Sequence, residues 1–371
     1  MTLLSGPEGI KWAFPLVPQR NELLSGYLCR VAAAHGASPH GFCSLYLADH
    51  SFWARDVDRG VVNGFHGLIS AQAGLSYEVI REMTLDRWRD VLVHSRYRTR
   101  ETMAVTPWIN AVGVFHRQRR QHALQFCRWC LAETGIIRKE WRLSFFVICD
   151  VHGIPLSDAC SCCDAAFIPH RSRGRGFQCH ACRDPLAVPP GKVPFPAPHS
   201  DLRRVAVFQA ALSAELAQHA GETGKVVVSD RLLGIRDLIS AISVEGRGPK
   251  TAELFGLCWS GGRSEAGRLE FARVGRRTAV MAVADALMKD WPDSFRRLGL
   301  EIGLTQVTFA RLQPLPQWVQ KEVEALPPGL HRVKTGRTTQ IVKCVADIEA
   351  KQPENWRVMR AGVLLRAARG R

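Results

Sequence analysis

Eight of the twelve cysteines lie between positions 127 and 182, at spacings typical of metal ligands. Cys127 and Cys130 form a Cys-x-x-Cys pair, and Cys149 and His152 form a Cys-x-x-His pair further along the chain. Each pair places two ligands on one tight turn, and two such pairs supply the tetrahedral set that Zn²⁺ prefers. These four residues therefore predict a structural zinc site.

A second set of four cysteines follows the first within the same segment. Cys160 and Cys163 form one pair, and Cys179 and Cys182 form the other. Cys162 could replace Cys163, but a knuckle needs two residues between its ligands for its backbone amides to face the sulfurs, so we assign Cys163. Four protein ligands fill each tetrahedral site and leave no position for water. The sequence thus predicts two zinc ions per chain, both structural and neither catalytic.

The remaining four cysteines stand alone in apolar helical patterns. We expect Cys29, Cys43, Cys258 and Cys344 to be buried small apolar side chains rather than ligands. No apolar run is long enough to cross a membrane, and the first residues lack the apolar stretch of a secretory signal. We therefore expect a cytoplasmic protein with no membrane partner, in which clustered cysteines favour metal over disulfides.

The chain is strongly basic, which favours a polyanionic partner. Fifty Lys and Arg residues oppose 34 Asp and Glu residues, and the net charge is +16. Such an excess attracts nucleic acid through counterion release, although a solubilising surface charge would give the same composition. Eight arginines between a helical segment and the first cysteine pair are the predicted nucleic-acid contacts, with a solvated face as the alternative. They are Arg87, Arg89, Arg96, Arg98, Arg100, Arg117, Arg119 and Arg120.

The segments expected to position these residues have sequence patterns typical of helices. Asn21 is the predicted N-cap of a helix that ends at Gly36, and Ser38 caps a second helix in which Leu45 is expected to point inward. Two helices joined by a short turn with a glycine are typical of a helix-turn-helix unit. The pattern returns at residues 71–76 and 302–305. A helical hairpin used only for packing is the alternative interpretation of each copy.

These signals predict a mainly α-helical protein of 371 residues with several units. An N-terminal helical domain with the helix-turn-helix unit covers residues 14–125, and two zinc-ribbon-like modules in tandem cover 126–184. The six prolines between 185 and 198 indicate a linker over 185–200. Residues 201–371 are predicted to form a C-terminal helical domain with a basic tail.

No enzymatic centre is evident in the sequence. It contains neither a phosphate-binding loop nor a His-Glu-x-x-His pair, and the last tyrosine, Tyr97, lies too early to be a recombinase nucleophile. We therefore expect a protein that is not an enzyme. A nuclease whose carboxylates converge only in the fold, and a zinc-containing sequence-specific transcription regulator, are the alternatives.

The order of these motifs resembles the TniQ family of transposition proteins, which includes TnsD-type target selectors. The resemblance covers roughly residues 14–185. It is carried by Pro18, Glu22, Leu23, Ser25, Tyr27, Leu28 and Arg30, then by Asp56, Trp108, Trp141 and Arg142, and by the cysteine pairs from Phe126 to Cys160. Cys160-Ser-Cys-Cys163-Asp164 departs from the Cys-Pro-x-Cys-Gly that is more usual in this family.

The resemblance implies a target-selection adaptor in DNA transposition. Such a protein marks the target, either bound to DNA or docked on a CRISPR effector complex with its guide RNA, and recruits an AAA+ ATPase transposition regulator. The transposase would then be reached indirectly. By the same resemblance, Tyr27 and Arg30 lie near the surface that meets the regulator. Which targeting route applies, and whether the chain forms a homodimer, stays open.

Overall fold

The computed structural model of the chain describes most of residues 11–329. The ranges of this segment that lie outside the described residues are 49–50, 61–64, 93–105, 113, 116–117, 120–121, 173–176, 192–199, 222–228, 245, 260–267 and 313. Everything below concerns the described residues.

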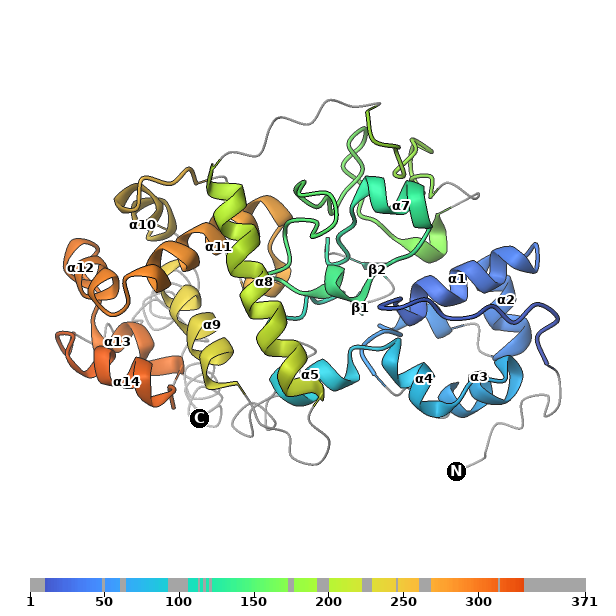
Figure 1. Ribbon diagram of the computed structural model, residues 1–371, viewed down its shortest axis with the longest axis horizontal. Helices are drawn as coiled ribbons and strands as arrows, with labels where there is room; N and C mark the ends of the chain where they lie inside the picture. Colours follow the sequence, from blue (N-terminus) through green and yellow to red (C-terminus); the bar gives the residue numbers. More distant parts are fainter. Residues whose placement is uncertain are drawn as a thin grey trace, which may run out of the picture. The chain divides into compact units, whose positions relative to one another are not determined.

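The fold is mainly α-helical, as predicted (Figure 1). The only paired strands among the described residues are β1 and β2, an antiparallel pair of two residues each, Val114–Phe115 and Gln118–Arg119. The α-helices are α1 Leu24–Ala34, α2 Pro39–Tyr46, α3 Phe65–Ala73, α4 Tyr77–Glu82, α5 Asp86–Leu92, α7 Arg128–Thr134, α8 Ser200–Gly221, α9 Asp230–Ile242, α10 Gly248–Leu254, α11 Val274–Lys289, α12 Asp293–Glu301, α13 Gln306–Phe309 and α14 Gln317–Glu324. Short 3₁₀ helices include η1 Phe52–Ala54, η3 Lys139–Arg142, η4 Pro169–Arg171, η5 Leu269–Phe271 and η6 Ala310–Leu312.

The first four helices share one apolar core with the segment that precedes them. Trp12 packs edge-on against Phe42 of α2, with ring centroids 5.2 Å apart. Its indole N–H donates to Gln72 of α3 at 3.0 Å, and Tyr27 of α1 is fully buried in the same core. Aromatic side chains therefore fix α1, α2 and α3 around Trp12.

The start of α1 differs from the prediction. Asn21 does not cap this helix, which begins at Leu24 with Leu23 as its N-cap. The Asn21 carbonyl instead accepts a hydrogen bond from the Lys139 amide, and Leu23 donates to Ile137. The chain pairs with this later segment before it turns helical, so a long-range contact outweighs a local capping preference.

The second helix begins where the sequence predicts. The Ser38 hydroxyl accepts from the Gly41 amide at 3.1 Å, and Pro39 occupies the first helical position. Ser76 caps α4 in the same way. The prediction for Leu45 was wrong, because this side chain is 69% exposed while Phe42 and Cys43 face the core. The rings that α2 turns toward Trp12 are those of Phe42 and Tyr46.

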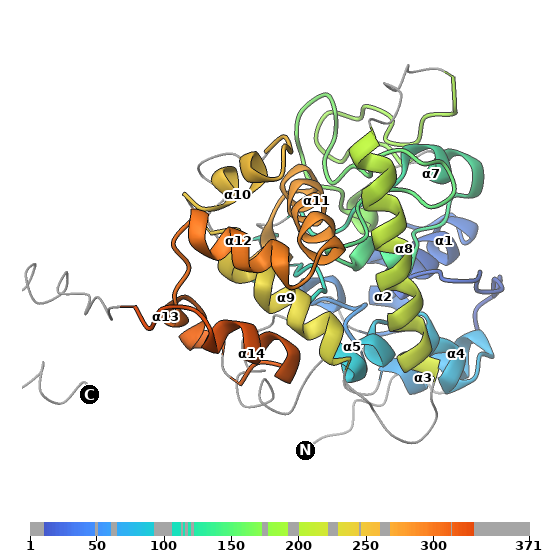
Figure 2. The same ribbon diagram turned by 60° about the vertical axis from the view of Figure 1, so that its left-hand side comes forward.

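Two further cores follow along the chain. The larger one combines Trp108, Trp141 and ligands of the first cysteine set with apolar residues of α8, α9 and α11. Helices α8 and α11 pack side by side (Figures 1 and 2). The third core is built from α9 to α14 around Phe295 and Phe309. The clustered cysteines thus belong to the largest core rather than to a separate surface lobe.

By their contacts, the described residues up to 327 form one compact unit. The predicted basic tail from 330 onward and most of the predicted linker, residues 192–199, lie outside the described residues. The domain boundaries that the sequence suggests therefore stay a prediction. None of the described helices is both long and apolar enough to cross a membrane.

Candidate metal centres

Three of the four predicted ligand pairs fold into the same turn. In each, the residue after the second ligand has a left-handed backbone: Gly153 with φ 66°, Asp164 with φ 58° and Arg183 with φ 67°. The amide of that residue donates to the carbonyl of the first ligand at 2.8–3.0 Å. An isolated antiparallel bridge closes each turn, and these bridges join Ile148 to Pro155, Ala159 to Ala166 and Gln178 to Pro185.

The fourth pair sits at the start of α7. Cys127 is the N-cap residue of this helix, and its sulfur accepts from the Cys130 amide at 3.5 Å. The His152 amide likewise points to the Cys149 sulfur at 3.4 Å. Amides that face the first sulfur of a pair stabilise a thiolate there, which is the form that binds metal.

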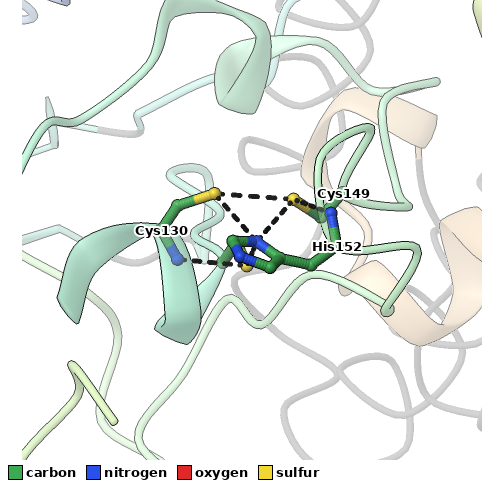
Figure 3. A group of neighbouring side chains, drawn as sticks. Cys130, Cys149 and His152 are labelled. Carbon is green, nitrogen blue, oxygen red and sulfur yellow. Dashed lines mark hydrogen bonds between the residues drawn. The ribbon is translucent and has the colours of Figure 1, made fainter. Parts of the chain in front are cut away.

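These turns bring the first predicted set together (Figure 3). The Cys130 sulfur lies 3.6 Å from the Cys149 sulfur and 3.2 Å from His152 Nδ1. His152 Nδ1 is also 3.5 Å from the Cys127 sulfur and 3.6 Å from that of Cys149. All three cysteines are buried. The four ligand atoms therefore face one common point.

The second predicted set converges in the same manner. The sulfurs of Cys160 and Cys182 lie 3.6 Å apart, and so do those of Cys163 and Cys179. Cys160 and Cys179 are buried, whereas Cys163 and Cys182 are exposed. All ligand atoms within each set lie within 4.8 Å of one another. Among the described residues, these two sets are the groups that could hold a metal ion.

The geometry fits zinc. A tetrahedral ion with Zn–S bonds of about 2.3 Å separates neighbouring sulfurs by about 3.8 Å. The observed sulfur–sulfur distances of 3.6 Å are close to this value. Hydrogen bonds from the thiols of Cys130 and Cys149 lower the pKa of Cys127 to about 3, which favours the thiolate form that binds metal. A bound cation would take the place of the remaining thiol protons.

The structure also bears on the choice between Cys162 and Cys163. Cys162 occupies the middle of the turn, is exposed and is not part of the converging group. We expect Cys163→Ser to lower the zinc content by one ion per chain, whereas Cys162→Ser leaves it unchanged. Elemental analysis of the two purified variants is the measurement. Equal zinc loss in both, or loss only in Cys162→Ser, would contradict this assignment.

The isolated cysteines do not all follow the expectation of burial. Cys43 is buried, but Cys29 is only half-buried and Cys258 is exposed. Cys258 follows the end of α10 and lies between Leu257 and Trp259, which pack against the cores. Cys344 lies outside the described residues.

A buried polar network joins the N-terminal helices to the segment that lies between the two ligand pairs of the first metal centre. Arg142, which is 1% exposed, makes a bidentate ion pair with Asp56 at 2.6 and 3.0 Å. It also contacts Asp58 at 3.3 Å and donates to the Asn110 carbonyl. Asp58 in turn accepts from the amide and the hydroxyl of Ser25 in α1. We call these residues the Arg142 network.

The contacts of Asn110 extend toward α11. Its side-chain oxygen accepts from Ser144 at 2.8 Å and from the buried Arg277 at 2.7 Å. Arg277 lies 3.7 Å from Asp158, which also accepts from the Val274 amide at the start of α11. Because Asp158 precedes Cys160 by two residues, this second run of contacts reaches the edge of the second metal centre.

The two predicted partner-binding residues both make contacts with the segment that precedes α1. Tyr27 is fully buried and donates to the Leu16 carbonyl at 2.9 Å, and burial raises its pKa to about 12. Arg30 makes a bidentate ion pair with Glu22 at 2.7 and 2.8 Å and also holds the Val17 carbonyl. Both side chains therefore hold the segment that precedes α1 against this helix. Contact of either residue with a partner stays a prediction.

The predicted nucleic-acid contacts are described only in part. Arg87 forms ion pairs with Glu78 and Glu82, and Arg89 donates to the Arg59 carbonyl. Arg119 lies in β2, of which only the backbone is described. The other five lie outside the described residues: Arg96, Arg98, Arg100, Arg117 and Arg120. Contact of any of the eight with nucleic acid stays a prediction.

Residues 13–156 match the TniQ family. The match ends between the two ligand sets, so it contains the Arg142 network and the first metal centre and stops short of the second. No curated protein matches the chain.

Proposed function

We propose that this chain, in which residues 13–156 match the TniQ family, is a non-catalytic adaptor that selects the target site in DNA transposition. The family match is the observation that carries this proposal. The chain would engage target DNA or a CRISPR effector complex with its guide RNA, and it would recruit an AAA+ ATPase transposition regulator. The transposase would reach the site through that regulator.

The described residues support a role without chemistry. Each candidate metal centre offers four protein ligands, so a bound zinc would have no open position for water and would act as a structural ion. The ionic side chains of the Arg142 network are paired with one another inside the fold. An adaptor needs only rigid surfaces that bind two partners. When both partners are bound to it, their encounter becomes effectively intramolecular.

The bridging role has a direct test. Target DNA, or the guide-RNA effector complex, is immobilised, and retention of the AAA+ regulator is measured with and without the purified chain. We expect retention only when the chain is present, and the Cys258→Ser variant should bridge as the wild type does. Equal retention without the chain would overturn the proposal. Cleavage of supercoiled DNA by the chain with Mg²⁺ would point to a nuclease instead.

Direct DNA binding by this basic chain should be mainly electrostatic. Because phosphate contacts release counterions, we expect the affinity to fall at least tenfold between roughly 50 and 200 mM salt. Arg87→Gln should change the affinity less than twofold, since its guanidinium is already paired with two carboxylates. Joint replacement of Arg96, Arg98 and Arg100 by glutamine should lower both the affinity and the salt dependence. Fluorescence anisotropy over a salt series measures both, and a flat response would contradict the prediction.

A further inference from the structure

Both ring nitrogens of His152 have defined neighbours. Nδ1 faces the three sulfurs of the first metal centre at 3.2–3.6 Å. Nε2 lies 3.1 Å from a carboxylate oxygen of Glu133. The Trp129 ring stands edge-on to the imidazole, with centroids 5.4 Å apart and planes at 87°. The imidazole is therefore held at its ligand atom, at its opposite nitrogen and along one side.

One turn of α7 supplies two of these groups. Cys130 and Glu133 are three residues apart in this helix, so their side chains lie on the same face. Cys130 provides a ligand sulfur, and Glu133 reaches past it to the far nitrogen of His152. The carboxylate is 45% exposed, whereas the imidazole is only 12% exposed. Glu133 thus lies at the rim of the site, outside the four ligand atoms.

The chemistry of a metal-bound imidazole gives this contact a role. A nitrogen that binds a cation carries no proton, so when Nδ1 is the ligand the ring proton is on Nε2. That N–H then donates to the Glu133 carboxylate. A histidine ligand whose other nitrogen donates to a carboxylate is fixed in tautomer and orientation and becomes a more basic ligand.

We propose that Glu133 is a positioning residue of the first metal centre, which holds His152 as the Nε2–H tautomer and thereby tightens zinc binding. This inference rests on the zinc occupancy proposed above and is independent of the bridging role. The second centre has four cysteines and no histidine ligand. The effect of Glu133 should therefore be confined to one of the two ions.

The test compares zinc affinities of the intact chain by competition with a chromophoric chelator. Glu133→Ala should weaken one of the two sites by roughly 10- to 100-fold, as loss of such an outer partner does. Glu133→Gln keeps an acceptor without the charge and should fall between this variant and the wild type. Asp150→Asn is the matched control, because Asp150 adjoins a ligand but pairs with Arg138. It should shift the affinity much less.

A second variant, His152→Cys, distinguishes an effect of Glu133 on the His152 imidazole from a general effect on α7. His152→Cys turns the first centre into a four-cysteine site that has no imidazole to orient. Glu133→Ala should then lose its effect on zinc affinity. Wild-type affinity in the Glu133→Ala variant, or an equal loss in the His152→Cys background, would overturn the proposal. Absence of zinc from the first site of the wild-type chain would overturn it as well, together with the proposed zinc occupancy, while leaving the bridging test unaffected.

Discussion

Replacement of Cys130 by serine is expected to remove one of two zinc ions and to disorder the segment from Cys127 to His152. The Cys130 side chain is buried, and its sulfur lies within 3.6 Å of two other predicted ligands. A structural zinc contributes on the order of 10 kcal/mol to the folding of its site, so loss of one ligand has a large local effect. Because these cysteines belong to the largest core, we also expect a clear fall in melting temperature.

The measurement pairs elemental analysis with thermal unfolding of the purified variants. Cys258→Ser is the matched control, since Cys258 is exposed and outside both ligand sets. It should keep two zinc ions and the wild-type melting temperature. Two ions in Cys130→Ser, or an equal loss in both variants, would show that the first centre does not bind metal as described.

The second large effect is expected for Arg142→Met. The substitution removes the guanidinium that pairs with Asp56 and Asp58, and Asp58 is only 4% exposed. Removal of one partner from a buried ion pair typically costs about 3–5 kcal/mol, because the other charge stays buried and uncompensated. The free energy of unfolding, measured by urea titration, should fall by that amount. Zinc content should be unchanged, because Arg142 contacts no ligand.

An exposed ion pair supplies the control. Arg87→Met removes an arginine whose partners, Glu78 and Glu82, are 62% and 47% exposed, so a loss of at most about 1 kcal/mol is expected. The double variant Arg142→Met with Asp58→Asn should recover part of the stability lost in Arg142→Met alone. If Arg142→Met lowered the free energy of unfolding by less than about 1 kcal/mol, the Arg142 network would not have the stabilising effect of a buried ion pair.

The two converging groups of candidate ligands could be predicted from the sequence because each pair is local. Two ligands separated by two residues share one turn, so their spacing alone carries the information. A residue with left-handed backbone follows the second ligand in three of the pairs, at Gly153, Asp164 and Arg183. Aspartate tolerates that conformation better than most residues do, so Asp164 supports Cys163 over Cys162 as the ligand.

The Arg142 network could not be predicted in this way. Arg142 meets Asp56 across 86 positions of the chain, and no spacing rule connects them. The same limitation applies to Asn21. Its carbonyl pairs with the Lys139 amide, and the residue does not cap α1 as the sequence predicts. The resemblance pointed to Tyr27 and Arg30 as residues near a partner, but a motif does not tell a framework residue from a contact residue. The burial of Tyr27 and the ion pair between Arg30 and Glu22 became visible only in the fold.

The most direct test of the adaptor function is transposition reconstituted with the transposase and the AAA+ regulator, with and without this chain. Insertion junctions are sequenced to count events and to map their positions. We expect insertions to collect at a fixed position relative to the target when the chain is present and to fall to background when it is omitted. The same number and distribution of insertions without the chain would contradict it.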